Sequence, residues 1–113
     1  MNDKSQTIQV EELLENSKAL EITKLSVKEL TPMFDFIFVC TASSSRHAKS
    51  IATNISRHFK PQFESTPRIE GLETCEWILI DLNDIIVHIM SKKTREFYKI
   101  EQLWQISTLP KEI

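Results

Sequence analysis

The sequence predicts one small α/β domain with a mixed β-sheet flanked by helices, in the order α-β-β-α-(β)-β-β-α. The segment from Phe34 to Thr41 is almost continuously apolar, which is typical of a strand covered on both faces. Two further apolar runs, Trp77 to Leu82 and Ile85 to Met90, flank a short turn and indicate a β-hairpin. Between the strand and the hairpin, apolar residues recur at helical spacing, so one helical crossover joins them.

Composition and charge narrow the class of protein. The chain has 113 residues, enough for one domain whose core needs neither disulfides nor a metal ion. Its net charge of −2 favours a protein partner over RNA, because proteins that hold RNA through phosphates need positive charge. Cys40 and Cys75 form no CxxC pair, as in a cytosolic protein with reduced thiols. No apolar run could span a bilayer, so we expect a cytoplasmic protein without membrane contact.

A helix and two strands are predicted first. Thr7 caps the helix, and the residues before it form a flexible tail. The apolar stripe of this helix consists of Val10, Leu13 and Leu14. The segment Glu21 to Val27 is a strand with Leu25 and Val27 on one side and Ile22 on the other, and the apolar run described above follows as a central strand.

A second helix follows the central strand. The serines Ser43 to Ser45 offer hydroxyl oxygens that can cap its N-terminus. One helical face consists of Ala48, Ile51, Ala52, Ile55 and Phe59. Pro61 ends the helix because proline lacks an amide donor. After a loop, Arg68 and Ile69 form a short strand.

The hairpin determines which side chains share a face of the sheet. A two-residue turn at Asn83-Asp84 is favoured because asparagine tolerates a positive φ. One face then pairs aliphatic residues: Leu82 with Ile85, Ile80 with Val87, and Ile78 with Ile89. The other face pairs Asp81 with Ile86, Leu79 with His88, and Trp77 with Met90. We expect the first face to be core and the second to be either half covered or a docking surface.

A final helix is predicted from Lys92 to Gln105, capped by Ser91. Its apolar stripe consists of Phe97, Ile100 and Trp104, widened by Tyr98 and Leu103. One side of the helix is expected to bury Phe97 and Ile100, which leaves the other large side chains open to a partner.

Two patterns could carry chemistry, but a simpler interpretation is favoured for each. Cys40 could be a nucleophile with His47 or His88 as its base, yet a cysteine in an apolar strand is far more often a buried thiol. Asp81 and Asp84 could hold a divalent cation, yet turn chemistry and exposure at a strand end explain them. We therefore predict no catalytic residue, no metal and no cofactor.

The start of the second helix has two interpretations. Ser43 to Ser45 could bind phosphate at the helix N-terminus, but no glycine or P-loop lysine accompanies them, and capping is the simpler account. Arg46, His47 and Lys49 form either a local basic patch or the ordinary solvated face of an amphipathic helix, which is the commoner case.

Several motifs together resemble a known family. They are the segment from Asp35 to His47, Glu70-Gly71, the segment from Trp77 to Met90, and Arg95-Glu96-Phe97-Tyr98 with Glu101 and Leu103-Trp104. Each is weak alone, but together they resemble the ribosomal silencing factors, the RsfS or Iojap family. The resemblance spans residues 8–105, between a flexible tail over 1–7 and a second tail over 106–113.

The resemblance implies a nucleotidyltransferase-like fold and a steric activity without a cofactor. Members of this family bind ribosomal protein fourteen of the large subunit and prevent joining of the two ribosomal subunits when nutrients are scarce. The resemblance also implies a homodimer of the free chain. We therefore expect a translational repressor that is not an enzyme, with little or no direct nucleic-acid binding.

The chain departs from the family pattern at a few positions. Ala42 and Asn83 stand where members often carry glycine, and Arg68 stands near a third such position. Asparagine serves a turn nearly as well as glycine. The loop from Lys60 to Arg68 is therefore the region to which the resemblance transfers least.

The docking surface is predicted from the unpaired chemistry of the second hairpin face together with the resemblance. Aromatic residues and methionine are enriched at interface cores, although a second core layer would look the same in sequence. The predicted docking residues are Trp77, Leu79, His88, Met90, Arg95 and Tyr98. One competing hypothesis is a nucleotidyltransferase acting on RNA or nucleotides, for which the alternating acidic pair is lacking. The other is direct RNA binding, against which the acidic balance counts.

Overall fold

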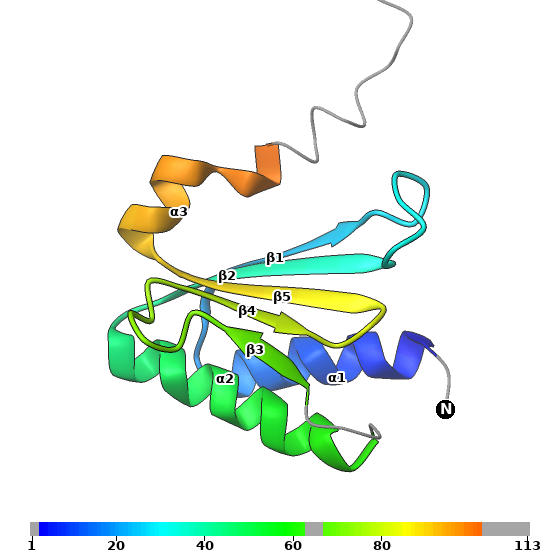
Figure 1. Ribbon diagram of the computed structural model, residues 1–113, viewed down its shortest axis with the longest axis horizontal. Helices are drawn as coiled ribbons and strands as arrows, with labels where there is room; N and C mark the ends of the chain where they lie inside the picture. The colour runs from blue at the N-terminus through cyan, green and yellow to red at the C-terminus, as the bar shows by residue number, and fades with distance from the viewer. Residues whose placement is uncertain (1–2, 63–66, 103–113) are drawn as a thin grey trace, which may run out of the picture.

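The computed structural model describes residues 3–62 and 67–102, which form a five-stranded mixed sheet between helices (Figure 1). In chain order the elements are α1 (Asp3–Asn16), β1 (Leu20–Ser26), β2 (Phe36–Ala42), α2 (Ser45–Phe59), η1 (Lys60–Gln62), β3 (Arg68–Glu70), β4 (Trp77–Asp81), β5 (Ile85–Ser91) and α3 (Lys92–Tyr98). The predicted class and order of elements are confirmed. Within the described ranges, none of the helices has both the length and the hydropathy needed to cross a membrane.

β2 and the central strand β5 form the parallel pair of the sheet. The strand order is β1-β2-β5-β4-β3, and every other neighbouring pair is antiparallel. A parallel pair requires a long crossover, which runs here through α2, η1, β3 and β4. Every residue of β2 after Phe36 is buried, as its continuous apolar run predicts.

The two faces of the sheet carry separate hydrophobic clusters. α1 and α2 cover one face and α3 lies on the other (Figure 1). The first cluster joins Val10 and Leu14 of α1 to the sheet and includes the five predicted α2 residues, Ala48, Ile51, Ala52, Ile55 and Phe59. The second cluster consists of Val27, Ile37, Val39, Ile86 and Met90. Ile22 packs on the first cluster and Leu25 on the second, which confirms the predicted sides of β1.

Helix α1 begins earlier than predicted. It starts at Asp3, so the predicted cap at Thr7 is wrong, and residues 3–7 are helical rather than a tail. Thr7 is 5% exposed and lies one turn before Val10. Side chains three or four residues apart share a helix face, so the Thr7 side chain extends the buried stripe of α1. Residues 1 and 2 lie outside the described residues.

The hairpin of β4 and β5 has the predicted register. Every cross-strand pair from Trp77–Met90 to Asp81–Ile86 is the predicted one. The Leu82 amide donates to the Ile85 carbonyl (2.9 Å), which closes the turn. Asn83 has a φ of 73°, a left-handed conformation that asparagine adopts at lower cost than most residues.

The last helix is shorter than predicted. α3 ends at Tyr98, because Lys99 has left-handed backbone angles (φ 50°, ψ 49°). Beyond this break Ile100 packs on the second cluster, whereas Phe97 is 77% exposed. The prediction that these two residues share a buried side is wrong, because it assumed an unbroken helix. Leu103 and the residues after it, including Trp104 and the C-terminal tail, lie outside the described residues.

Gly71 permits a close backbone approach just before β4. Its φ of 94° is rare for residues with a Cβ, and a Cβ placed there would overlap the Trp77 carbonyl oxygen. We predict that Gly71→Ala lowers the free energy of unfolding by about 2–4 kcal/mol, because left-handed strain adds to displacement of β4. Chemical denaturation measures this loss. The control Glu73→Ala, at an exposed position of the same loop, should stay within about 0.5 kcal/mol of wild type. Equal stability of both variants would contradict the close approach.

Candidate docking surface

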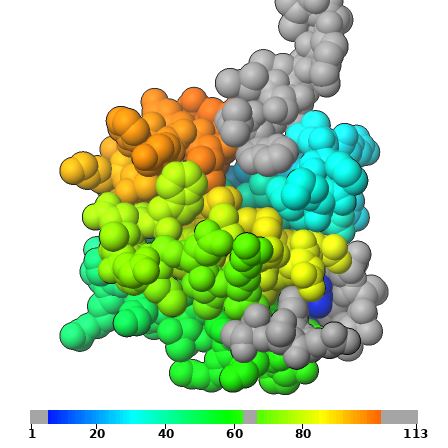
Figure 2. Space-filling model, viewed as in Figure 1, coloured from blue at the N-terminus to red at the C-terminus, as the bar shows by residue number. Residues whose placement is uncertain are grey.

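Aromatic and apolar side chains gather where α3 meets the start of β4. In Figure 2 the orange atoms of α3 stand directly above the green atoms of β3 and β4, and together they form one continuous surface. We define the aromatic surface as Trp77, Leu79, His88, Phe97 and Tyr98. Phe97 is 77% and Tyr98 54% exposed, and the other three side chains are half-buried.

Three of these side chains form a continuous row of rings. The Tyr98 ring centre lies 4.9 Å from that of Trp77, at an interplanar angle of 49°. It also lies 4.9 Å from that of Phe97, at an angle of 82°. Tilted and edge-to-face arrangements of this kind are preferred by aromatic pairs. The row therefore runs from the half-buried indole of Trp77 to the open ring of Phe97.

The indole of Trp77 is held in place by His88. Its N–H donates to Nδ1 of His88 at 2.9 Å. Only an unprotonated Nδ1 can accept this hydrogen bond. Burial lowers the pKa of His88 from 6.5 to about 4, so the imidazole is neutral at physiological pH. The hydrogen bond then fixes the orientation of the indole beneath Tyr98.

Arg95 attaches α3 to the strands on the far side of β5. Its side chain is 11% exposed, and Nη2 forms an ion pair with Glu101 at 2.6 Å. Nη1 donates to Oγ1 of Thr41 (3.0 Å) and to the carbonyl of Glu21 (2.6 Å), and Nη2 donates to Oγ1 of Thr23 (3.0 Å). These bonds link α3 to β1 and β2 and so position the two aromatic residues at its end.

The N-terminus of α3 is tied to the residue that precedes β4. The hydroxyl of Ser91 caps the helix by accepting the Thr94 amide at 3.1 Å. The Ser91 amide donates to the carbonyl of Glu76 (3.0 Å), and the Thr94 hydroxyl donates to its carboxylate (3.2 Å). Because contacts hold α3 at its N-terminus and at Arg95 in its middle, the aromatic surface is preorganised before any partner arrives.

The structure brings four of the six predicted docking residues together, namely Trp77, Leu79, His88 and Tyr98. Met90, another predicted docking residue, does not reach this surface, because it is fully buried in the second cluster beneath it. Arg95 does not point outward either, since its guanidinium bonds to the sheet and to Glu101. Both residues support the surface from below.

Phe97 belongs to the aromatic surface, although its helical spacing with Ile100 predicts a buried position. Its exposure follows from the left-handed conformation of Lys99, which ends α3 before Ile100. A glycine or asparagine at that position would have signalled the end of the helix. Lysine gives no such signal, so the helical spacing of Phe97 and Ile100 was misleading.

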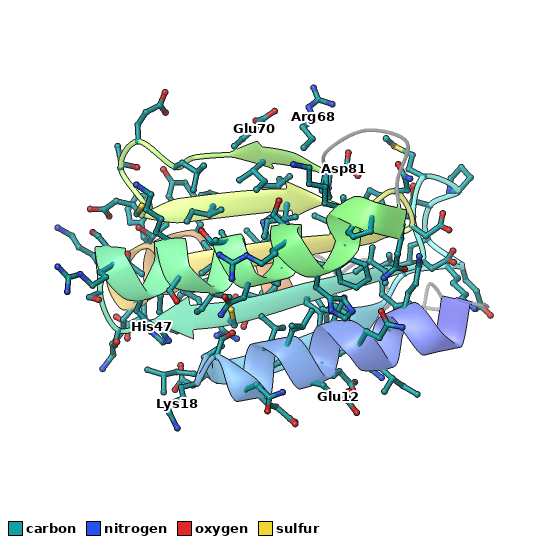
Figure 3. All side chains as sticks on the ribbon, turned by 90° about the horizontal axis from the view of Figure 1, so that it is seen from below. Glu12, Lys18, His47, Arg68, Glu70 and Asp81 are labelled. Atoms are coloured by element: carbon teal, nitrogen blue, oxygen red, sulfur yellow. The ribbon has the colours of Figure 1, made fainter. Side chains whose placement is uncertain are left out.

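Charged side chains border the aromatic surface along β3. Arg68 and Glu70 form an exposed pair at 3.5 Å. The register places Glu70 opposite Leu79 and Arg68 opposite Asp81, so these side chains share the face of the aromatic surface. Figure 3 shows the labelled Arg68, Glu70 and Asp81 along this edge. An apolar centre with a polar border is the usual anatomy of a protein interface.

The simpler interpretation of Cys40 holds in the structure. Cys40 is fully buried, and burial raises the pKa of its thiol to about 12 although Arg95 acts in the opposite direction. A protonated, buried thiol is a poor nucleophile. Both nitrogens of His47 are engaged, Nδ1 with the Ser43 amide (2.9 Å) and Nε2 with the Ser17 carbonyl (2.8 Å).

The other candidate chemical patterns also serve the fold. Oδ1 of Asp81 accepts the Asn83 amide at 2.8 Å, as in an Asx turn. Ser44 caps α2 by accepting the amide of His47 at 3.0 Å, as the capping interpretation predicts. Beside this cap lies a hollow of about 560 Å³, which Glu76 helps to line. In the part of the chain that the structure describes, no group of three His, Cys, Asp or Glu side chains could hold a metal ion.

Comparisons with known proteins agree on one group of relatives. Residues 2–112 match the family described as "Ribosomal silencing factor during starvation". Ribosomal silencing factor RsfS of Haemophilus influenzae is 36% identical over 93 residues, covering 82% of this chain and 91% of that protein. The mouse protein "Mitochondrial assembly of ribosomal large subunit protein 1" is 24% identical over 104 residues, covering 89% of this chain and 46% of that protein. A crystal structure of a Chromobacterium violaceum protein is similar with a TM-score of 0.86 and 32% identity, covering 93% of this chain and 88% of that one.

The lowered pKa of His88 predicts a pH dependence of stability. Between pH 6.5 and 4 the unfolded chain takes up a proton at His88 that the folded chain does not, so stability is present near neutral pH and is lost on acidification. From pH 7 to 4.5, the free energy of unfolding of wild type should fall by on the order of 2 kcal/mol more than that of His88→Gln. Denaturation at several pH values measures this difference. Parallel pH profiles for the two proteins would contradict the buried neutral imidazole.

Proposed function

This chain belongs to the ribosomal silencing factor family, and from that premise we propose that it represses translation by docking on ribosomal protein fourteen of the large subunit. Bound there, it blocks joining of the small subunit, mainly when nutrients are limiting. The aromatic surface is the observation that carries this proposal. The description of the family links it to starvation, and the name of the mouse relative links that protein to the large subunit.

The aromatic surface has the properties of a docking centre. Tryptophan and tyrosine are enriched among the few residues that contribute most of the binding energy of interfaces. Two such side chains stand here in contact, with an exposed Phe97 beside them. Aromatic side chains lose little conformational entropy on binding, and the bond from Trp77 to His88 removes part of that loss in advance.

A steric mechanism requires a rigid surface of sufficient area and no catalytic group. A blocker must be rigid and must cover a surface that the small subunit would occupy, and a typical partner contributes about 800 Å² to such an interface. Both attachments of α3 supply the rigidity. We therefore propose that the protein acts in the cytoplasm without catalysis and without a cofactor.

The same surface would serve a homodimer of the free chain. Two copies joined there would hide Phe97 and Tyr98 from the ribosome, because a C2 interface uses one patch of both subunits. Dimer and ribosomal complex would then exclude one another.

Removal of the two exposed rings should abolish docking without unfolding the protein. We predict that Phe97→Ala combined with Tyr98→Ala weakens binding to purified ribosomal protein fourteen by at least about 100-fold, since each anchor contributes about 2 kcal/mol. Isothermal titration calorimetry gives the Kd, and a thermal melt checks the fold. The matched control is Ile8→Ala, an exposed apolar residue of α1 on the opposite face, which should bind as wild type does. Unchanged affinity of the folded double variant would exclude the aromatic surface as the docking site.

A further inference from the structure

The outer face of α2 carries a row of cations with no acidic residue beside them in sequence. Arg46, Lys49, Arg57 and Lys60 are all exposed. They recur with Thr53 at intervals of three or four residues, so they lie along one helical face that is about 20 Å long. Residues 36–63 contain no Asp or Glu, although the whole chain has a net charge of −2. This segment is therefore net positive within a chain that is net negative.

Internal ion pairs do not account for these cations. Among the described residues the ion pairs are Lys24–Glu11, Arg68–Glu70 and Arg95–Glu101, and none involves α2. On the neighbouring helix α1, Glu11 pairs with Lys24 of β1, and Glu12 lies on the side away from α2 (Figure 3). Within residues 3–62 and 67–102, no ion pair engages Arg46, Lys49 or Arg57 of α2, or Lys60 at its C-cap.

The placement of one of these cations, Arg46, costs helix stability. Arg46 lies in the first turn of α2 and Lys49 in the second, and the first turn contains no acidic residue. The helix dipole makes this end positive, so it favours anions and disfavours cations. An ordinary solvated face would gain from a glutamate there. Binding of an anionic partner by these cations would offset this loss of helix stability.

We propose that the outer face of α2 binds the phosphate backbone of RNA. Along 20 Å, one strand of a nucleic-acid duplex presents about six phosphates, which is enough for four cations in a row. A lipid surface fits less well, because the exposed large apolar side chains of the described residues do not include any on α2. The identification of this RNA as ribosomal rests on the proposed function, whereas affinity for RNA itself does not. This inference departs from the expectation of little nucleic-acid binding drawn from net charge.

The position of α2 suits a second contact. α2 covers the sheet face opposite α3, so RNA on α2 and a protein on the aromatic surface would not compete (Figure 1). Two linked contacts bind more tightly than either one, because the second forms at a high effective concentration. The chain would therefore bind large subunits more tightly than it binds isolated ribosomal protein fourteen.

A salt titration tests the proposal directly. The probe is a labelled RNA duplex of roughly 20 base pairs, followed by fluorescence anisotropy. Four phosphate contacts predict that affinity falls roughly 100-fold between about 50 and about 200 mM KCl. The variant Arg46→Gln, Lys49→Gln, Arg57→Gln, Lys60→Gln should lose this binding. The control Lys18→Gln, Lys92→Gln, Lys93→Gln, Lys99→Gln removes the same charge from exposed positions outside α2 and should retain it. Equal loss in both variants, or no binding by wild type, would overturn the proposal.

A single substitution separates binding from stability. Arg46→Glu should raise the thermal midpoint, because it improves the interaction with the helix dipole, and should weaken RNA binding more than tenfold. A variant that is more stable but binds RNA as wild type does would overturn the proposal. Tighter binding to polyglutamate or to vesicles of anionic lipid than to RNA would overturn it as well.

Binding to whole large subunits, compared with binding to isolated ribosomal protein fourteen, distinguishes the RNA site on α2 from the proposed docking on the aromatic surface. The α2 variant should bind isolated ribosomal protein fourteen normally but large subunits at least tenfold more weakly. If the unmodified chain binds RNA but does not bind isolated ribosomal protein fourteen, the proposed docking is contradicted and the RNA site still stands. Unchanged affinity of the α2 variant for large subunits would show that the RNA site does not act on the ribosome.

Discussion

The antiparallel pairing of β4 with β5 is the constraint on which the rest of the structure depends. Because side chains alternate along a strand, this register sends Ile78, Ile80 and Val87 to the cluster beneath α2 and leaves Trp77 and His88 on the opposite face. A shift by one residue would exchange the two sets. Asn83 at the turn and the Leu82–Ile85 hydrogen bond hold the register that creates the aromatic surface.

Helix α3 completes that surface by lying across the second face of the sheet. Its N-terminus is bonded to Glu76, and Arg95 reaches over β5 to Thr23 and Thr41. Met90 is fully buried, whereas Phe97 and Tyr98 of the helix are open to solvent. Exposed aromatic rings on a rigid support are costly in a free protein, since apolar area stays in contact with water. A partner that covers them would recover this free energy.

Much of this architecture could be predicted because its signals are local. The hairpin register, the cap at Ser44 and the buried face of α2 follow from alternation, hydroxyl chemistry and helical spacing. The aromatic surface was only partly predictable, because exposure depends on how α3 packs. Nothing in the sequence marks Lys99 as left-handed, and nothing local reveals that Arg95 turns inward to the sheet. Predictions failed where tertiary contacts overrode local pattern.

The two faces of the molecule have different chemistry, and the proposed activity follows from the first of them. The aromatic face suits a protein partner and the cationic face of α2 suits RNA, while the buried thiol of Cys40 and the neutral His88 support the fold. The most direct measurement is light scattering of purified ribosomal subunits as they join, with large subunits first saturated with this chain. The account predicts that joining falls in proportion to the fraction of large subunits occupied. Free joining of fully occupied large subunits would contradict it.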